Sequence, residues 1–463
     1  MIKPSKLPNK GKNKTGKRCS NNNYATDWHE WRCHSMLQLK NPGLTPMSFA
    51  RFALALQQRR KTQKGPHMSN SDPVVILSYA RTPMGGMQGA LGEVSASDLG
   101  AVAVKAAVER AGVDGADVER IYMGNVLSAG QGQAPARQAA IFAGLPQSVE
   151  ATTVNKMCGS GMQAAIMGAE ALAAGSIDMI VAGGMESMTN APYLLPKMRS
   201  GARLGHTEAK DHMFLDGLED AYEPGRAMGS FAEETVGEYQ LTREAQDDYS
   251  IESLARAKAA VEGDAFDDEV VAVQVKTRKG DVTVDKDEQP LKGNPDKIPQ
   301  LRPAFAKDGT ITAANASSIS DGAAAMVLTR ASIAESKGLT PVARIVAHAA
   351  HAHAPSKFTT APVAAIQKVL DKAGWSVADV DLWEVNEAFA CVAMFAMQDI
   401  GISRDKLNVN GGATALGHPI GASGARIMVT LIAALKKRGL KKGVAALCIG
   451  GGEATAVALE LID

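Results

Sequence analysis

Hydrophobic and polar residues alternate with two different periods along most of the chain. Short β-branched runs at residues 74–77 and 121–123 predict buried strands. Between them, the apolar spacing over 97–110, closed by Gly112, predicts an amphipathic helix. This strand, helix, strand order predicts an α/β fold.

The same order of elements returns twice. A helix is predicted at 162–174 before a strand at 177–182, and near the C-terminus strands at 380–385 and 443–447 flank a helix at 424–435. The repetition predicts two similar core halves, each rich in βαβ units.

The segment between the halves has a different character. It is rich in charge, Gly and Met, and it contains an amphipathic helix at 242–260, whereas 310–328 returns to the alternating pattern and completes the first half. The predicted organisation is a leader at 1–67, an N-terminal core half at 68–187 and 320–340, an inserted loop domain at 188–319, and a C-terminal core half at 341–463.

The net charge of +1 conceals a basic leader. Residues 1–67 carry 14 Lys and Arg against 2 Asp and Glu, a balance of +12, and the remainder carries −11. This leader shows no sustained apolar period, so we expect it to be disordered. Three interpretations of the leader are open: a dispensable extension before a start at Met68, an organellar presequence, or a nucleic-acid-binding arm. We favour the first, because basic runs are usually only solvated, and we predict no nucleic-acid partner.

Composition excludes several classes of protein. With 463 residues, 45% hydrophobic and 21% charged, the chain resembles ordinary globular proteins, and no apolar run reaches the roughly 18 residues that cross a bilayer. Five widely spaced cysteines without a CxxC pair predict a reducing compartment rather than a disulfide framework. We therefore predict a cytoplasmic protein, with a mitochondrial location as the alternative if the leader is a presequence. No phosphate loop or dinucleotide fingerprint is present.

Cys158 is the first candidate for chemistry. It lies in the turn Asn155-Lys156-Met157-Cys158-Gly159-Ser160-Gly161, after a strand and directly before an Ala-rich helix. A helix N-terminus is expected to lower the pKa of such a thiol and favour the nucleophilic thiolate, although most single cysteines are buried and inert.

Three further polar residues occupy comparable loop positions. His418 lies in a Gly-rich loop, where it could take a proton from a thiol. Cys448 ends a buried strand before Gly450-Gly451-Gly452, whose N–H groups could bind an oxyanion, or it is a small core residue. Asn386 stands at a strand-to-helix junction, where an N-cap is the alternative role.

Taken together, these segments resemble the thiolases over essentially all of residues 72–463. The similar blocks are Cys158-Gly159-Ser160-Gly161, Gly184-Met185-Glu186-Ser187-Met188, Asn386-Glu387-Ala388-Phe389, Gly417-His418-Pro419-Ile420-Gly421 and Cys448-Ile449-Gly450-Gly451-Gly452. The resemblance implies a thiolase fold, layered αβαβα, and the reaction acetyl-CoA + acetyl-CoA ⇌ acetoacetyl-CoA + CoA.

The resemblance also implies a role for each residue. Cys158 is the nucleophile that becomes acetylated, His418 is its base, and Cys448 is the second acid/base. Asn386 holds a water that forms one oxyanion hole with His418, and the backbone N–H groups of Cys158 and Gly450 form the other.

Contacts to CoA follow from the same resemblance. Ser317 and Ala316 match the family's pantetheine-contacting loop, and Met228 matches a pocket-lining Met, although Ala227 stands where the family usually has His. Phe389 and Phe358 are further candidates for the substrate wall, and Phe358 is as well explained by packing under a loop. CoA is a substrate and product, so no cofactor is predicted, and no metal either.

Two alternatives remain open. A broader 3-ketoacyl-CoA thiolase of fatty-acid β-oxidation would use the same residues with a deeper pocket, and a catalytically silent thiolase-like binding protein would share only the fold. The family implies a homo-oligomer, a dimer or a tetramer.

Overall fold

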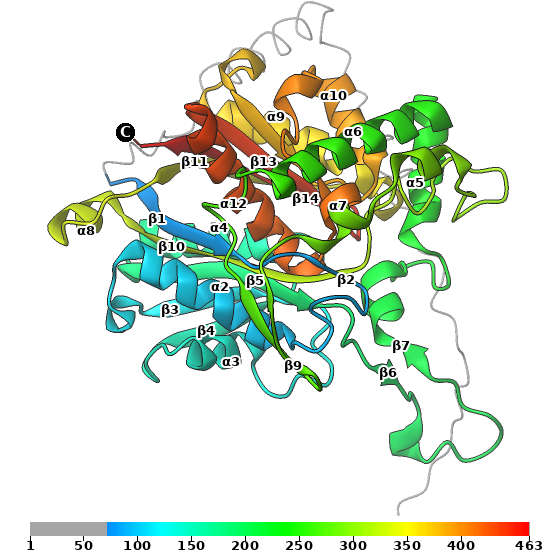
Figure 1. Cartoon of the computed structure of the whole chain (residues 1–463), viewed down its shortest axis with the longest axis horizontal. Coiled ribbons are helices and arrows are strands. Elements are labelled where there is room, and N and C mark those ends of the chain that lie inside the picture. Colours follow the sequence, from blue (N-terminus) through cyan, green and yellow to red (C-terminus); the bar gives the residue numbers. More distant parts are fainter. Residues whose placement is uncertain (1–71, 463) are drawn as a thin grey trace, which may run out of the picture. The chain divides into compact units, whose positions relative to one another are not determined.

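The computed structural model describes residues 72–462, and the predictions for the basic leader lie outside them. One large mixed sheet runs through the described part (Figure 1), in the order β12-β13-β14-β11-β1-β10-β5-β3-β4, with β2 paired to β10. Its strands are β1 (Val74–Arg81), β2 (Gly85–Gly86), β3 (Arg120–Gly124), β4 (Glu150–Val154), β5 (Met179–Ser187), β10 (Ser320–Arg330), β11 (Ala343–Ala352), β12 (Leu382–Val385), β13 (Lys442–Ile449) and β14 (Glu453–Leu461).

The sheet consists of two halves with the same strand pairing. In the first, β3 runs parallel to β5, β5 antiparallel to β10, and β10 antiparallel to β1. In the second, β12, β13, β14 and β11 repeat this sequence of pairings. The halves meet where Val75 and Ile76 of β1 pair with Arg344 and Ala343 of β11.

Helices cover both faces of each half. The core helices are α2 (Ala96–Ala111), α3 (Pro135–Phe142), α4 (Ser160–Ala173), α8 (Ala331–Ser336), α9 (Ala361–Ala373), α10 (Ala390–Ile400), α11 (Ala413–Leu416) and α12 (Ile420–Arg438). In Figure 1, α4 and α12 lie between the two sheet halves, α2 and α3 cover the first half from outside, and α9 and α10 cover the second.

Side-chain alternation along the strands builds three apolar layers. In β5, Met179 and Val181 face the outer core with α2, whereas Ile180 and Ala182 face the middle core with α4 and α12. In β13, Val444 contributes to the core with α9 and α10. The predicted αβαβα layering is confirmed, because the central strands, such as β1, β5, β10 and β13, are buried on both faces between helices.

The segment between β5 and β10 contributes no strand to this sheet. It contains the hairpins β6 (Tyr193–Leu194) with β7 (Lys210–Asp211) and β8 (Val273–Thr277) with β9 (Gly280–Val284), and the helices α5 (Met228–Tyr239), α6 (Arg243–Glu262) and α7 (Glu288–Lys292). Thr242, the first residue of the predicted helix, is the N-cap of α6 and accepts from the N–H of Ala245.

Two predicted segments compare with the observed strands as follows. The alternating stretch 310–328 is a strand only from Ser320, the predicted boundary of the core half, because Asn315 accepts from the N–H of Thr312 and donates to the carbonyl of Thr310, which folds the preceding residues into a turn. The strand expected at 177–182 continues to Ser187, through two glycines that leave room for neighbouring backbone.

No helix between Asp72 and Ile462 combines the length and the apolar character that a bilayer crossing requires.

Candidate active site

The turn around Cys158 is held by short-range hydrogen bonds. Met157 has a left-handed backbone (φ 47°), and the Oγ of Ser160 accepts from the N–H of Lys156 at 2.8 Å and donates to the carbonyl of Met157 at 2.6 Å. A Cβ on Gly159 would lie 2.4 Å from the Cδ1 atom of Ile449, so a larger residue there would have to displace that side chain. The turn fixes Cys158 two residues before the first residue of α4.

The expectation that the helix N-terminus makes Cys158 a thiolate is wrong. Burial raises the pKa of the Cys158 thiol to about 11, and the nearby Glu186 carboxylate adds to the rise. The backbone N–H groups of Gly450 and Cys158 oppose it by hydrogen bonding to the sulfur. Because burial outweighs them, Cys158 needs a base to become nucleophilic.

His418 is a neutral base with a defined tautomer. Burial, assisted by the charge of Arg426, lowers its pKa to about 3. Its Nδ1 lies 2.5 Å from the Oγ of Ser423, and that hydroxyl donates its hydrogen to the carbonyl of Pro419 at 2.9 Å. Nδ1 therefore carries the imidazole proton and Nε2 is free to accept one.

Asn386 faces this unprotonated nitrogen of His418. Its Nδ2 lies 3.4 Å from His418 Nε2, while its Oδ1 accepts from the Arg426 guanidinium, also at 3.4 Å. Arg426 in turn pairs with Glu384 at 3.5 Å, and all of these side chains are buried. Asn386 is not an N-cap, since α10 begins at Ala390 and Phe389 is its capping residue.

Cys448 and Gly450 approach Cys158 from the second half of the sheet. Cys448 is buried near the end of β13, and burial together with the neighbouring Cys158 raises its pKa well above the ordinary value. The N–H of Gly450 bonds to the Cys158 sulfur, and a Cβ on Gly450 would lie 3.5 Å from the sulfur of Met228. Cys158 also packs in one apolar cluster with Ile420, two residues after His418. The structure thus brings together Cys158, His418, Asn386, Cys448 and Gly450.

The predicted CoA-side residues form an adjoining wall. Ala316 and Phe389 pair as a single antiparallel bridge, and the N–H of Ser317 donates to the carbonyl of Ala388 at 2.9 Å. The ring of Phe358, buried in a 3-10 helix (Pro355–Thr360), meets that of Phe389 edge to face at 6.3 Å. Phe358 therefore packs against the Phe389 side chain of this wall.

A cavity of about 400 Å³ opens beside these residues. Met157, Met228, Gly450 and Gly451 line one side, and the π-helical turn Phe214–Leu218 with the adjoining acidic residues lines the other. Its contact with Gly450 makes it the candidate approach to Cys158.

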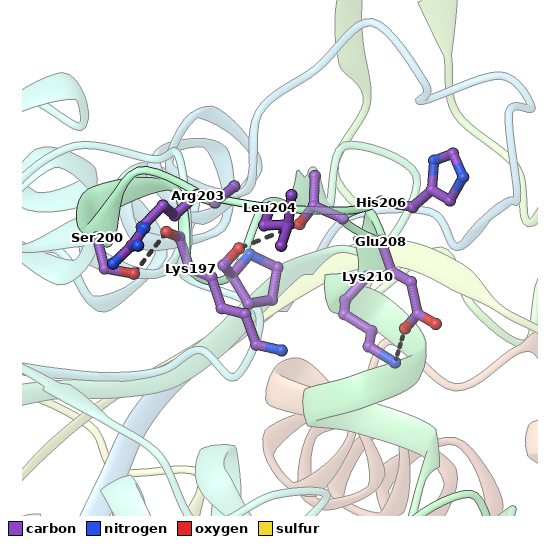
Figure 2. Close-up of a pocket in the computed structure, with 10 residues that line it drawn as sticks. Lys197, Ser200, Arg203, Leu204, His206, Glu208 and Lys210 are labelled. Atoms are coloured by element: carbon purple, nitrogen blue, oxygen red, sulfur yellow. Dashed lines mark hydrogen bonds and ion pairs between the residues drawn. The ribbon is translucent and has the colours of Figure 1, made fainter.

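A second cavity of about 380 Å³ lies on the arm formed by β6 and β7 (Figure 2). Lys197, Arg203 and His206 line it, and Lys210 pairs with Glu208 at 2.8 Å. It shares no lining residue with the site around Cys158. Over residues 72–462, no group of three or more His, Cys, Asp or Glu side chains is placed to hold a metal ion.

Sequence reasoning missed two residues of the site. Arg426 had a usable signal, because it is a single cation next to the long apolar run of α12 and a buried cation needs a partner. Ser423 had no such signal in the sequence, since nothing in a Gly-rich segment shows which hydroxyl contacts the His418 imidazole.

The fold has two similar halves, and the residues at its centre are those of a class of thiol-dependent acyltransferases. The family model of the thiolase N-terminal domain matches residues 74–332, and that of the thiolase C-terminal domain matches 339–461. The chain belongs to the thiolase family.

Particular relatives are similar over the same region. The "Acetyl-CoA acetyltransferase" of Rhizobium meliloti (strain 1021) is 49% identical over 394 residues, 85% of this chain and 100% of that protein. "Acetyl-CoA acetyltransferase 2" of Arabidopsis thaliana is 50% identical over 85% of this chain and 98% of its own length. The crystal structure of the Acat5 thiolase from Ascaris suum in complex with coenzyme A covers 84% of this chain and 100% of its own, with 43% identity and a TM-score of 0.80.

Ser423→Ala tests the tautomer assignment. Without its hydroxyl partner, the imidazole loses the contact that keeps the proton on Nδ1, so we expect the acylation rate of Cys158 to fall about 10-fold with little change in KM. Stopped-flow single turnovers measure this rate. An unchanged rate would show that another contact fixes the tautomer.

Proposed function

We propose that the chain is an acetyl-CoA C-acetyltransferase, which reversibly condenses two acetyl-CoA to acetoacetyl-CoA and CoA through an acetyl thioester on Cys158. One observation carries the proposal: the half-buried Cys158 thiol, which bonds to the N–H of Gly450, shares a site with a neutral histidine whose Nε2 carries no proton and with the buried Cys448. Covalent acyl transfer and enolate chemistry need these three groups.

The first half of thiolysis uses all three side chains. His418 Nε2 takes the Cys158 proton as the sulfur attacks the C3 carbonyl of acetoacetyl-CoA. The C2–C3 bond then breaks, leaving acetyl-Cys158 and the enolate of acetyl-CoA, and the Cys448 thiol gives its proton to C2. The raised pKa of Cys448 suits this step, because it keeps the resting group a thiol.

The second half returns the enzyme to its starting state. The thiol of CoA gives its proton to the Cys448 thiolate and attacks the acetyl carbon. The bond from that carbon to Cys158 breaks, acetyl-CoA leaves, and His418 returns its proton to Cys158. Condensation is the same sequence in reverse.

Two sets of donors would stabilise the oxygen anions. The backbone N–H groups of Cys158 and Gly450 both bond to the Cys158 sulfur. Their convergence on this atom supports the proposal that they form one oxyanion hole. The second hole would pair His418 with a water held by Asn386, whose Nδ2 already points to the imidazole.

The pantetheine arm of CoA would lie along Ser317, Ala316, Met228 and Phe389. The bridge between Ala316 and Phe389 and the closeness of Met228 to Gly450 support this path, because they make a continuous wall that ends at Cys158. CoA is substrate and product here, and we propose no cofactor and no metal. The cytoplasmic location stays a prediction.

Thiolysis by the full chain tests the activity and its nucleophile together. We expect acetoacetyl-CoA to be cleaved in strong preference to a C8 3-ketoacyl-CoA, and Cys158→Ala to lower the rate at least about 1,000-fold. Cys391→Ala controls for the loss of a buried thiol: Cys391 packs in the same core cluster as Cys448, so we expect a far smaller loss of turnover than for Cys158→Ala. Equal or faster cleavage of the long chain would instead favour the β-oxidation enzyme, and no cleavage of either would favour a silent binding protein.

Cys448→Ala separates the two roles of cysteine. The variant keeps Cys158 and His418, so we expect acetyl-CoA still to acetylate Cys158 in mass spectra of the quenched protein. It should lose the exchange of the acetyl methyl protons with D2O, because no group takes the α-proton. Exchange at the rate of the unsubstituted chain would contradict the assigned role.

We also propose a homo-oligomer, a dimer or a tetramer. On the arm of β6 and β7, Tyr193, Leu195 and Leu204 are 69%, 55% and 96% exposed, which is costly for apolar side chains on a monomer. Light scattering of the purified chain should give a mass at least twice 48.5 kDa. A monomeric mass would rule the proposal out.

A further inference from the structure

Glu186 is a buried carboxylate for which the mechanism above has no use. Its Oε1 accepts from Asn125 Nδ2 at 2.8 Å and from the N–H of Leu127 at 3.1 Å. Its Oε2 accepts from the N–H of Val126 at 3.0 Å and from that of Gly421 at 2.9 Å. Four donors and no acceptor surround the two oxygens, so this environment fits an ionised carboxylate.

The register of the two sheet halves gives Glu186 a counterpart. Gly124 of β3 lies opposite Gly184 of β5, and Val385 of β12 lies opposite Ala446 of β13. Asn125 directly follows Gly124, as Asn386 directly follows Val385. Glu186 comes two residues after Gly184, as Cys448 comes two residues after Ala446. The Asn and carboxylate of one half therefore occupy the positions of the Asn and cysteine in the other.

Each half holds the start of the other half's central helix. Gly450, from the second half, bonds to Cys158 just before α4. Glu186, from the first half, bonds to Gly421 in the first turn of α12, three residues after His418. A Cβ on Gly421 would lie 2.6 Å from Glu186 Oε2, so the carboxylate and the helix start are in direct contact.

We propose that Glu186 is a positioning residue of the acyl-transfer site, whose carboxylate holds the end of α12 that carries His418 against the turn that carries Cys158. Loss of its charge slows acylation of Cys158 without weakening CoA binding. This inference rests on the proposed function, because its readout is that reaction.

A dependence on pH follows from the burial of the carboxyl group. Burial raises the pKa of Glu186 to about 7, against the lowering by its backbone donors, and Asp321 adds to the rise. The titratable groups around it are Asp321 on β10, Cys158 before α4 and His418 before α12. A protonated carboxyl cannot accept from all four donors, so acylation should slow as pH falls through about 7. His418 cannot produce this limb, since its own pKa is about 3.

The same shift has the opposite effect on folding. Because the pKa of Glu186 is higher in the folded chain than the ordinary 4.5, the folded state binds this proton more tightly. Between pH 7 and 4.5, the contribution of this group to stability therefore rises as pH falls. Loss of activity toward acid without a lower melting temperature thus distinguishes positioning from unfolding.

Single-turnover acylation by acetoacetyl-CoA between about pH 5.5 and 9 provides the test. In the unsubstituted full chain, the acylation rate should fall toward acid with its midpoint near pH 7; this decline is called the acid limb. Glu186→Gln should lower the plateau rate about 10- to 100-fold, abolish the limb, and leave KM for CoA within about threefold. Asp321→Asn is the matched control: its hydrogen bonds run to Thr189, Met188 and Ser187 and not to Glu186, so it should keep the plateau rate and move the midpoint of the acid limb to lower pH.

Several outcomes would overturn the inference. They are a plateau rate of Glu186→Gln within twofold of the unsubstituted chain, an acid limb that persists in that variant, or a rate loss that parallels a lower melting temperature. If Glu186→Gln does not fold, Glu186→Asp must retain the limb with a lower plateau. An unsubstituted chain without turnover at about pH 8 would instead count against the proposed function.

Discussion

The site depends on the close approach of the first turns of α4 and α12, where a glycine of each helix lies against the backbone of the other. A Cβ on Gly161 of α4 would lie 2.8 Å from the N of Ala425, and one on Gly424 of α12 would lie 2.4 Å from the N of Met162. The strands below are as tight, because a Cβ on Gly184 would lie 2.1 Å from the carbonyl oxygen of Gly421. Only glycines allow backbones to pack at this distance, and the packing brings Cys158 and His418 to the same place.

Burial then sets the protonation states that the chemistry starts from. With the pKa of Cys158 near 11 and that of His418 near 3, the resting pair is a thiol and a neutral imidazole rather than an ion pair. In the proposed reaction, the proton would therefore move as the sulfur attacks, when the N–H groups at the site can stabilise charge on the substrate oxygen. Removal of water strengthens those hydrogen bonds and makes an early ion pair costly.

The sequence predicted most of the fold and named the residues that the structure brings together around Cys158. Period and β-branching were sufficient for β1, β3, α2 and α4, because these elements bury one or both faces in a continuous core. The segment 310–319 was assigned to the inserted loop domain, but its turn was not predictable, since the hydrogen bonds of Asn315 that form it override an alternating pattern. The thiolate state of Cys158 was predicted wrongly, because a turn motif shows the helix N-terminus but not the depth of burial.

What the sequence could not show is how the halves act on each other. Glu186 was visible as part of a motif, yet its partner Gly421 lies 235 residues away and contributes only a backbone N–H, which no pattern of side chains records. The same holds for Gly450, whose N–H reaches Cys158 from the other half. In the proposed mechanism, equivalent strand ends of the two halves would have different roles: Cys448 would be the acid/base thiol, and Glu186 the acceptor that holds the facing helix. The division requires both halves in a single packed core, so the site forms only when the whole fold does.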